Sequence, residues 1–157
     1  MLAVHRGVWL RAECWARGAR DAELLSRLPT LARILERSQA LMRDAPGRTY
    51  LSLMTQGTNV KPHCGPTNHR LRVHLPLLLP ARSEWGIVVG GERRTWELGR
   101  CLVLDDSFEH SVDLSNGPPA GGASAQVAEE QHLSRVVLVA DCWHPDAEWL
   151  VPLAERR

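Results

Sequence analysis

The sequence predicts one mainly β domain, a sandwich or barrel, with helices packed on its outside near the N-terminus. From Arg48 onward, short runs of strand-forming residues alternate with turn residues at regular spacing, a pattern typical of sandwiches and barrels. Before that point, the leucines have helical spacing. The length of 157 residues is enough for one domain with a real core and short for two.

The N-terminal part, residues 1–47, is predicted to be helical. Between Asp21 and Arg43 the apolar residues recur at the period of an amphipathic helix. Pro29 interrupts the pattern, because proline removes a backbone donor and clashes with the preceding turn. We therefore expect two short helices or one kinked helix, packed against the outside of a sheet. The apolar positions are Leu24, Leu25, Leu28, Leu31, Ile34 and Leu35.

Residues 48–146 are predicted to form the β-barrel core. Gly90 and Gly91 lie between two strand-forming runs, which is strong hairpin chemistry. An acidic turn separates two further runs, and Pro80 closes another. The predicted strands are Thr49–Thr55, Arg70–Leu79, Trp85–Val89, Arg93–Glu97, Arg100–Leu104, His110–Leu114 and Arg135–Cys142.

One segment of this region, 116–131, departs from the strand pattern. It reads NGPPAGGASAQVAEEQ and holds few large apolar residues. Such a segment cannot bury enough surface to order itself, so we expect a flexible insertion loop near the mouth of any pocket. A tolerated surface insertion is favoured over a substrate lid.

The composition is that of a soluble globular protein, with 19 basic and 18 acidic residues. No basic run with interleaved aromatics occurs, so nucleic acid is not an expected partner. No apolar stretch is long enough to cross a bilayer, and the first 20 residues lack the apolar core of a signal peptide. The four cysteines show no CxxC spacing. We therefore expect a cytoplasmic protein without a membrane partner, while an upstream anchor outside this sequence stays open.

The segment 63–75, HCGPTNHRLRVHL, carries the densest chemistry of the chain. His63 stands just before a Gly-Pro turn and is a candidate metal ligand. Arg72 and His74 are two residues apart, so on a strand their side chains leave the same face, and the aliphatic residues between them face the other way. This segment predicts one wall of a pocket for a metal and an anion.

Two later segments complete the pattern. Residues 102–112, LVLDDSFEHSV, consist of an apolar strand, an acidic turn and a short strand that carries His110. Residues 134–145, SRVVLVADCWHP, form a strong β run with Arg135 near its start. Imidazole suits iron, and the planar fork of arginine binds a carboxylate bidentately. Together these groups indicate a non-haem iron oxygenase that uses 2-oxoglutarate.

Four blocks of the sequence, in order, resemble the aspartyl/asparaginyl β-hydroxylase family. They are HCGPTNHRLRVHL (63–75), RTWELG (94–99), DDSFEH (105–110) and VADCWHP (139–145). That family is a branch of the Fe(II)- and 2-oxoglutarate-dependent dioxygenases. The resemblance implies a double-stranded β-helix, which is a cupin-like jelly roll. It also implies hydroxylation of a peptidyl side chain, aspartyl or asparaginyl, with Fe(II), 2-oxoglutarate and O2.

The resemblance implies a role for each matching residue. The implied catalytic residues and iron ligands are His63 and His110. Gly65 lies two residues after the first histidine, where most iron oxygenases of this class carry a carboxylate. The hydroxylase family also has glycine there, so two histidines and water are the implied ligands. The implied 2-oxoglutarate-binding residues are Ser52, Arg72, His74 and Arg135.

Some of these residues also fit a structural role. His74 alone is compatible with a buried core histidine. Asp105 and Asp106 lie in a turn, where aspartate commonly bonds its own backbone, so that role is favoured over metal binding. Cys64 is expected to point away from the site, because neighbours on an extended segment alternate.

Other functions stay open on the sequence alone. The same chemistry on a lipid acyl chain or another small substrate is the nearest alternative to a peptide or protein substrate. A non-catalytic barrel that binds a metal or a carboxylate is the second. A zinc hydrolase built on His63, His110 and a cysteine is the third, but it does not account for Arg72 and Arg135 together.

Overall fold

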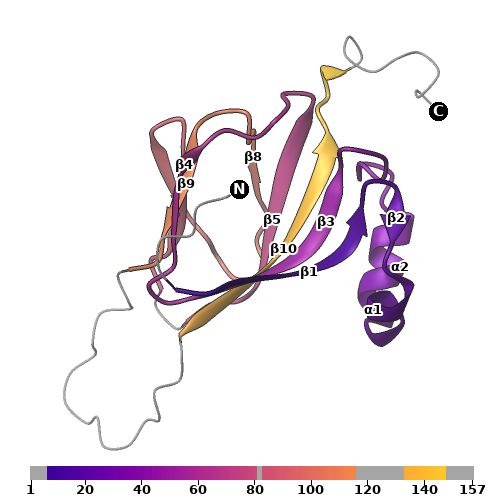
Figure 1. The fold of residues 1–157 in the computed structure, drawn as a ribbon, viewed down its shortest axis with the longest axis horizontal. Helices are drawn as coiled ribbons and strands as arrows, with labels where there is room; N and C mark the ends of the chain where they lie inside the picture. The colour runs from indigo at the N-terminus through magenta and orange to yellow at the C-terminus, as the bar shows by residue number, and fades with distance from the viewer. Residues whose placement is uncertain (1–6, 81–82, 116–132, 148–157) are drawn as a thin grey trace, which may run out of the picture.

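The computed structural model describes residues 7–80, 83–115 and 133–147, which form two antiparallel sheets and two short helices. The six-stranded sheet has the order β2-β1-β3-β10-β5-β8 and the four-stranded sheet the order β4-β9-β6-β7 (Figure 1). In the larger sheet the strands are β2 (Ala19–Arg20), β1 (Trp9–Ala16), β3 (Arg48–Thr55), β10 (Ser134–Trp143), β5 (Arg70–Leu78) and β8 (Leu102–Leu104). In the smaller sheet they are β4 (Asn59–His63), β9 (His110–Asp113), β6 (Gly86–Val89) and β7 (Glu92–Thr95).

The two sheets pack face to face. Their shared core takes side chains from both, because every second residue of a strand points to the same face. The larger sheet contributes residues such as Met54 and Leu104, and the smaller sheet contributes Val60, Ile87 and Val112. This confirms the predicted mainly β jelly-roll fold, a double-stranded β-helix.

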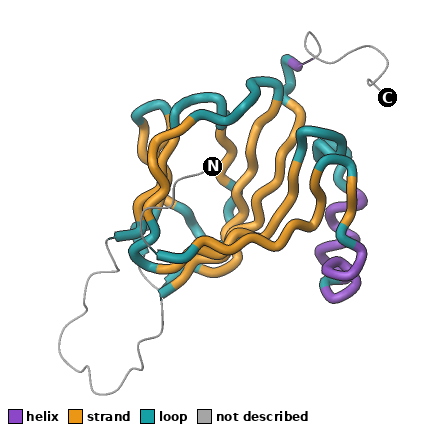
Figure 2. Tube along the Cα trace, viewed as in Figure 1, coloured by secondary structure: helices purple, strands orange, loops and turns teal. Residues whose placement is uncertain are grey.

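The two helices lie together beside β1 and β2, at the side of the molecule away from the four-stranded sheet (Figure 2). Helix α1 (Ala22–Arg27) begins after Asp21, whose carboxylate accepts a hydrogen bond from the Leu24 amide at 2.8 Å. Helix α2 (Pro29–Arg37) has proline at its first position, where the missing donor costs nothing. The prediction of two short helices outside the barrel is confirmed.

The apolar faces of the helices are buried against β1. Cys14 of that strand is fully buried, and it packs with Leu25 of α1 and with Ala32 and Leu35 of α2. The helices therefore cover the outer face of β1 and leave its other face for the interior between the sheets.

The N-terminal part, expected to be helical, also contains two strands. β1 was not predicted, because its sequence WLRAECWA places charged residues on the interior side and so hides the usual alternation. β4 was also missed, since it is short and contains a proline. The predicted loop 116–131 lies outside the described residues.

Neither helix in the described part of the chain is long and apolar enough to cross a bilayer.

Candidate metal and carboxylate site

A cavity of about 330 Å³ lies between the two sheets. All six residues that the sequence singled out line it, although they come from five different strands. Histidines of the smaller sheet face arginine, serine and histidine side chains of the larger one. The six are Ser52, His63, Arg72, His74, His110 and Arg135.

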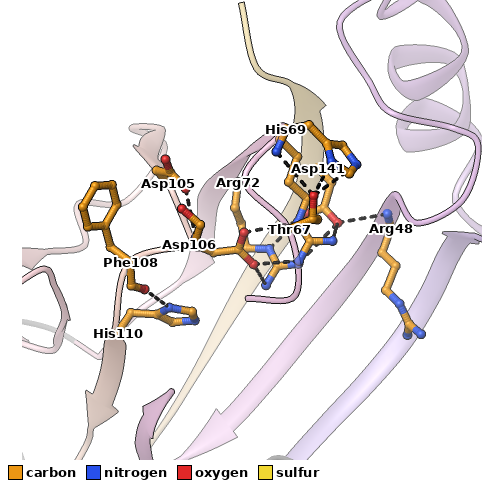
Figure 3. Close-up of polar contacts among 11 residues, drawn as sticks. Arg48, Thr67, His69, Arg72, Asp105, Asp106, Phe108, His110 and Asp141 are labelled. Carbon is orange, nitrogen blue, oxygen red and sulfur yellow. Dashed lines mark hydrogen bonds and ion pairs between the residues drawn. The ribbon is translucent and has the colours of Figure 1, made fainter. Parts of the chain in front are cut away.

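His63 and His110 meet because they end the paired strands β4 and β9, where they are directly opposite each other. Their ring centroids are 4.2 Å apart. Each Nδ1 hydrogen-bonds a backbone carbonyl two residues earlier, that of Lys61 at 2.8 Å and that of Phe108 at 2.9 Å (Figure 3 draws the second). A carbonyl only accepts, so each Nδ1 carries the proton and each Nε2 holds the lone pair that a metal needs.

The protonation of His110 also suits a metal ligand. Burial is the main cause that lowers the pKa of His110, and the nearby His63 adds to it. The ring is therefore neutral at physiological pH, which is the form that binds metal ions.

His74 is a buried hydrogen-bond donor rather than a metal ligand. Trp96 donates its indole Nε1–H to His74 Nδ1 at 3.3 Å. Burial, assisted by the positive charges of Arg135 and Arg72, lowers the pKa of His74 well below its ordinary value. The ring is neutral, and because its Nδ1 accepts, its proton lies on Nε2.

Arg135 is buried without an acidic partner among the described residues. Its side chain is 2% exposed, and its Nε and Nη1 atoms have no hydrogen-bond partner. Its Nη2 lies 3.0 Å from the sulfur of Met54, and its guanidinium carbon is 4.0 Å from the Trp96 ring centroid. Burial lowers the pKa of Arg135 to about 9. A buried cation with free donors is costly, so this site suits a carboxylate ligand.

A second group of arginines lies in the cavity beside His110, and both of its members form ion pairs with aspartates. Arg70 binds Asp106 at 2.7 Å and Asp141 at 3.0 Å, and Arg72 binds the same two carboxylates at 3.0 and 2.9 Å. Figure 3 shows Asp106 and Asp141 on either side of Arg72, with the amide of Arg48 donating to Asp141. Arg72, predicted as a ligand-binding residue, is thus held by two aspartates.

Asp106 differs from its predicted turn role. Asp105 makes the turn bond, since it accepts from the Ser107 amide at 2.9 Å. Asp106 instead is fully buried. Burial works against its charge, but the hydrogen bonds of Arg70 and the charge of Arg72 lower the pKa of Asp106 below its ordinary value.

Gly65 packs directly on Asp106. Its amide donates to the Asp106 carbonyl at 2.6 Å, and a Cβ at this position would lie 2.6 Å from the Asp106 carboxylate. Any side chain would need Asp106 to move, so the space for a third protein ligand two residues after His63 is already filled. No group of three metal-binding side chains was found within the described residues, and Cys64 is exposed.

Ser52 is positioned by a residue that the sequence did not point to. Trp9 of β1 donates its Nε1–H to Ser52 Oγ at 3.0 Å, and Ser52 is 1% exposed. Trp9 was missed together with β1. Arg70 was missed although it continues the alternation of Arg72 and His74 on β5, and that alternation was the signal that could have found it.

Comparison with known proteins gives a consistent result. The family described as "Aspartyl/Asparaginyl beta-hydroxylase" matches residues 2–120. The aspartyl/asparaginyl beta-hydroxylases of Mus musculus and Homo sapiens are each 33% identical over 142 residues, which is 90% of this chain and 17% of theirs. Aspartate beta-hydroxylase domain-containing protein 1 of Homo sapiens is 41% identical over 100 residues, 64% of this chain and 22% of that protein.

Two solved structures show a more distant likeness. A prolyl-4-hydroxylase from Pseudomonas putida is 12% identical with a TM-score of 0.47, covering 91% of this chain and 77% of that one. A cupin domain of a transcriptional regulator from Enterobacter cloacae is 7% identical with a TM-score of 0.48, covering 87% and 97%. Likeness at this level concerns the fold alone.

The family match includes both histidines and the RVH segment of β5, whereas Arg135 lies beyond it. The chain spans less than a quarter of the length of the mammalian relatives named above. The match covers well over half of the chain itself. The chain therefore belongs to the aspartyl/asparaginyl β-hydroxylase family.

Proposed function

We propose that this protein is an Fe(II)- and 2-oxoglutarate-dependent dioxygenase that hydroxylates a peptidyl side chain, aspartyl or asparaginyl as in the names of its relatives. One observation carries the proposal. Arg135 is buried and unpaired in the same cavity as two histidines whose Nε2 atoms hold lone pairs. A keto-diacid bound to a metal would supply the carboxylate that Arg135 lacks.

The residues that line the cavity fit both the iron and 2-oxoglutarate. His63 and His110 would hold the iron through Nε2, and water would complete its coordination because Gly65 leaves no room for a protein carboxylate. Arg135 would bind the distal carboxylate of 2-oxoglutarate, with the Ser52 hydroxyl beside it. Bound iron, with 2-oxoglutarate and O2, supplies the oxidising chemistry that no side chain provides.

The remaining groups orient the co-substrate and keep it dry. His74 would donate its Nε2–H to a 2-oxoglutarate oxygen, because its Nδ1 is occupied by Trp96. The Trp96 ring also lies against the Arg135 guanidinium, so one indole fixes both binding groups. Arg72, held by Asp106 and Asp141, presents a positive edge to the cavity without being free to move.

Succinate formation tests the proposal. Protein is incubated with Fe(II) and 2-oxoglutarate in air, with and without aspartyl and asparaginyl peptides. We expect succinate from the wild type and none from His63→Ala or His110→Ala. His144→Ala is the matched control, because this histidine does not line the cavity. Undiminished turnover in both cavity variants, or a wild type that neither binds nor consumes 2-oxoglutarate, contradicts the proposal.

A further inference from the structure

Six arginines line the cavity, and acidic side chains neutralise three of them. Two belong to the network with Asp106 and Asp141. The third, Arg48, binds Glu13 at 3.0 Å. The six are Arg11, Arg17, Arg48, Arg70, Arg72 and Arg135. The cavity therefore keeps three uncompensated guanidinium groups, of which the proposed function uses only Arg135.

Arg11 and Arg17 are the two that the proposed function leaves without a role. Both are exposed cavity-lining residues, on β1 and in the turn that follows it. Neither forms an ion pair with any residue in the ranges 7–80, 83–115 and 133–147. Their charges are therefore available to a ligand.

Arg11 is held in a defined place. It lies opposite Ser52 in the β1–β3 register. Its guanidinium carbon is 5.4 Å from the centroid of the Trp9 ring and 5.6 Å from that of Tyr50. Aromatic rings attract the flat face of a guanidinium, while its N–H donors lie at the edge. Contact with two rings limits the motion of the side chain and leaves those donors for a carboxylate.

Arg17 sits in a backbone conformation that ordinary residues avoid. Its φ is 52°, in the left-handed region that is unfavourable for a non-glycine residue. Its amide donates to the Gly47 carbonyl at 3.2 Å, which fixes the turn beside the cavity. The side chain is therefore carried on a fixed turn on the same side of the cavity as Arg11.

We propose that Arg11 and Arg17 bind acidic groups of the substrate that are separate from the side chain to be hydroxylated. This inference rests on the proposed function and names its substrate class, an acidic peptide segment. 2-Oxoglutarate has two carboxylates; under the proposed function one would serve the metal and the other would pair with Arg135. It leaves none for β1, so the anion there belongs to the substrate. Arg11 and Arg17 are six residues apart along β1 and its turn, so each guanidinium group can bind a separate carboxylate through charge-assisted hydrogen bonds. Together they attract an acidic segment from a distance.

Fluorescence anisotropy with two defined peptides tests the inference. Both carry one central aspartate, which is flanked by glutamates in one peptide and by lysines in the other. The protein is loaded with Mn(II) and an inert 2-oxoglutarate analogue, so no turnover is needed. For the wild type we expect the glutamate peptide to bind about ten-fold more tightly, as two exposed ion pairs imply.

The variant Arg11→Gln/Arg17→Gly should lose that preference. Glycine at position 17 keeps the left-handed backbone without strain. Arg27→Gln/Arg33→Gln is the matched control, since it also removes two positive charges and both residues are exposed arginines on the helices outside the cavity. We expect this control to keep the wild-type preference, which separates a local effect from a change in net charge.

Three results would overturn the inference. They are equal affinity of the wild type for both peptides, no binding of either, and an unchanged preference in Arg11→Gln/Arg17→Gly. Binding of 2-oxoglutarate is measured by tryptophan quenching on the same proteins, loaded with Mn(II) alone. If the wild type binds 2-oxoglutarate but shows no charge preference, the substrate inference alone fails. If it does not bind 2-oxoglutarate at all, the proposed function fails instead.

Discussion

The paired arginines of β5 and the unpaired Arg135 of β10 line one cavity under opposite electrostatic conditions. Arg70 and Arg72 share two buried aspartates and form a neutral group of four charges. Arg135 is at least as deeply buried, contacts the Met54 sulfur and the Trp96 ring, and has no acidic partner among the described residues. In the first group the arginines and aspartates compensate one another. In the second, two donors of the Arg135 guanidinium are left for a ligand.

The difference separates two uses of the same residue type. A buried charge that is already paired holds strands together, because removal of one partner leaves the other uncompensated. A buried charge without a partner costs stability and is retained where it binds something. The two arginine sites should therefore respond in opposite directions to mutation.

The largest effect on stability is expected from mutation of the paired arginine network. Asp141→Ala removes one carboxylate from Arg70 and Arg72 and an acceptor from the Arg48 amide. We expect the free energy of unfolding to fall by about 3–5 kcal/mol, the usual cost of breaking a buried ion pair. Urea unfolding monitored by circular dichroism measures it. A loss below about 1 kcal/mol, the value of a surface pair, would contradict the structural role of the network.

Mutation of the unpaired Arg135 should weaken ligand binding without lowering stability. Arg135→Met keeps much of the side-chain volume and removes a buried charge that has no acidic partner. We expect stability without ligand to be unchanged or higher, and 2-oxoglutarate affinity to fall by about 2–5 kcal/mol, as for a buried charge pair that loses one member. Calorimetric titration of the Mn(II)-loaded protein checks affinity. Unchanged affinity would remove Arg135 from this role.

Substitution of Gly65 tests the contact between the segment after His63 and Asp106 of the paired network. Gly65→Ala places a Cβ 2.6 Å from the Asp106 carboxylate, and overpacking of this kind costs about 1–3 kcal/mol. A double-mutant cycle with Asp106→Ala isolates the contact. The cost of Gly65→Ala should shrink in the Asp106→Ala background. Equal costs in both backgrounds would show that the contact with Asp106 is not the cause.

The smallest effect is a pH dependence. The pKa of His74 is lowered in the folded protein, from an ordinary value of 6.5. Below that value, the unfolded chain takes up a proton that the folded protein refuses. Stability therefore falls as the pH drops below about 6.5, by up to about 1.4 kcal/mol per pH unit. His74→Gln should reduce this slope in urea unfolding between pH 7.5 and 5.5; identical slopes would contradict it.

The elements predicted from the sequence are those whose pattern is set by local physics. Asp21 caps a helix and Pro29 begins the next, so the two helices follow from neighbouring residues. The strand that carries His74 has clear alternation, and the strand that carries Arg135 is a continuous run of strand-forming residues. β1 was not predicted because Trp9 and Arg11 face a polar cavity. A strand that lines such a cavity lacks the usual alternation of apolar and polar residues.

The candidate site also has a part that the sequence predicts and a part that it does not. The sequence located His63, His110 and Arg135, which the structure brings to one cavity. The two histidines lie in specific motifs, and Arg135 stands near the start of a strong β run. It could not tell that Arg72 is paired while Arg135 is not. That distinction depends on Asp106 and Asp141, which are distant in sequence and meet Arg72 only through the sheet order. Pairing across strands has no local signal.

The position of β10 has a consequence for how the protein is made. This strand, the last of those described, is inserted between β3 and β5 and hydrogen-bonds with both. It brings Arg135 and Asp141 with it, so the earlier strands have neither until residue 143 has left the ribosome. A ligand that needs Arg135 can therefore bind only after β10 has been synthesised and has paired with both of its neighbours.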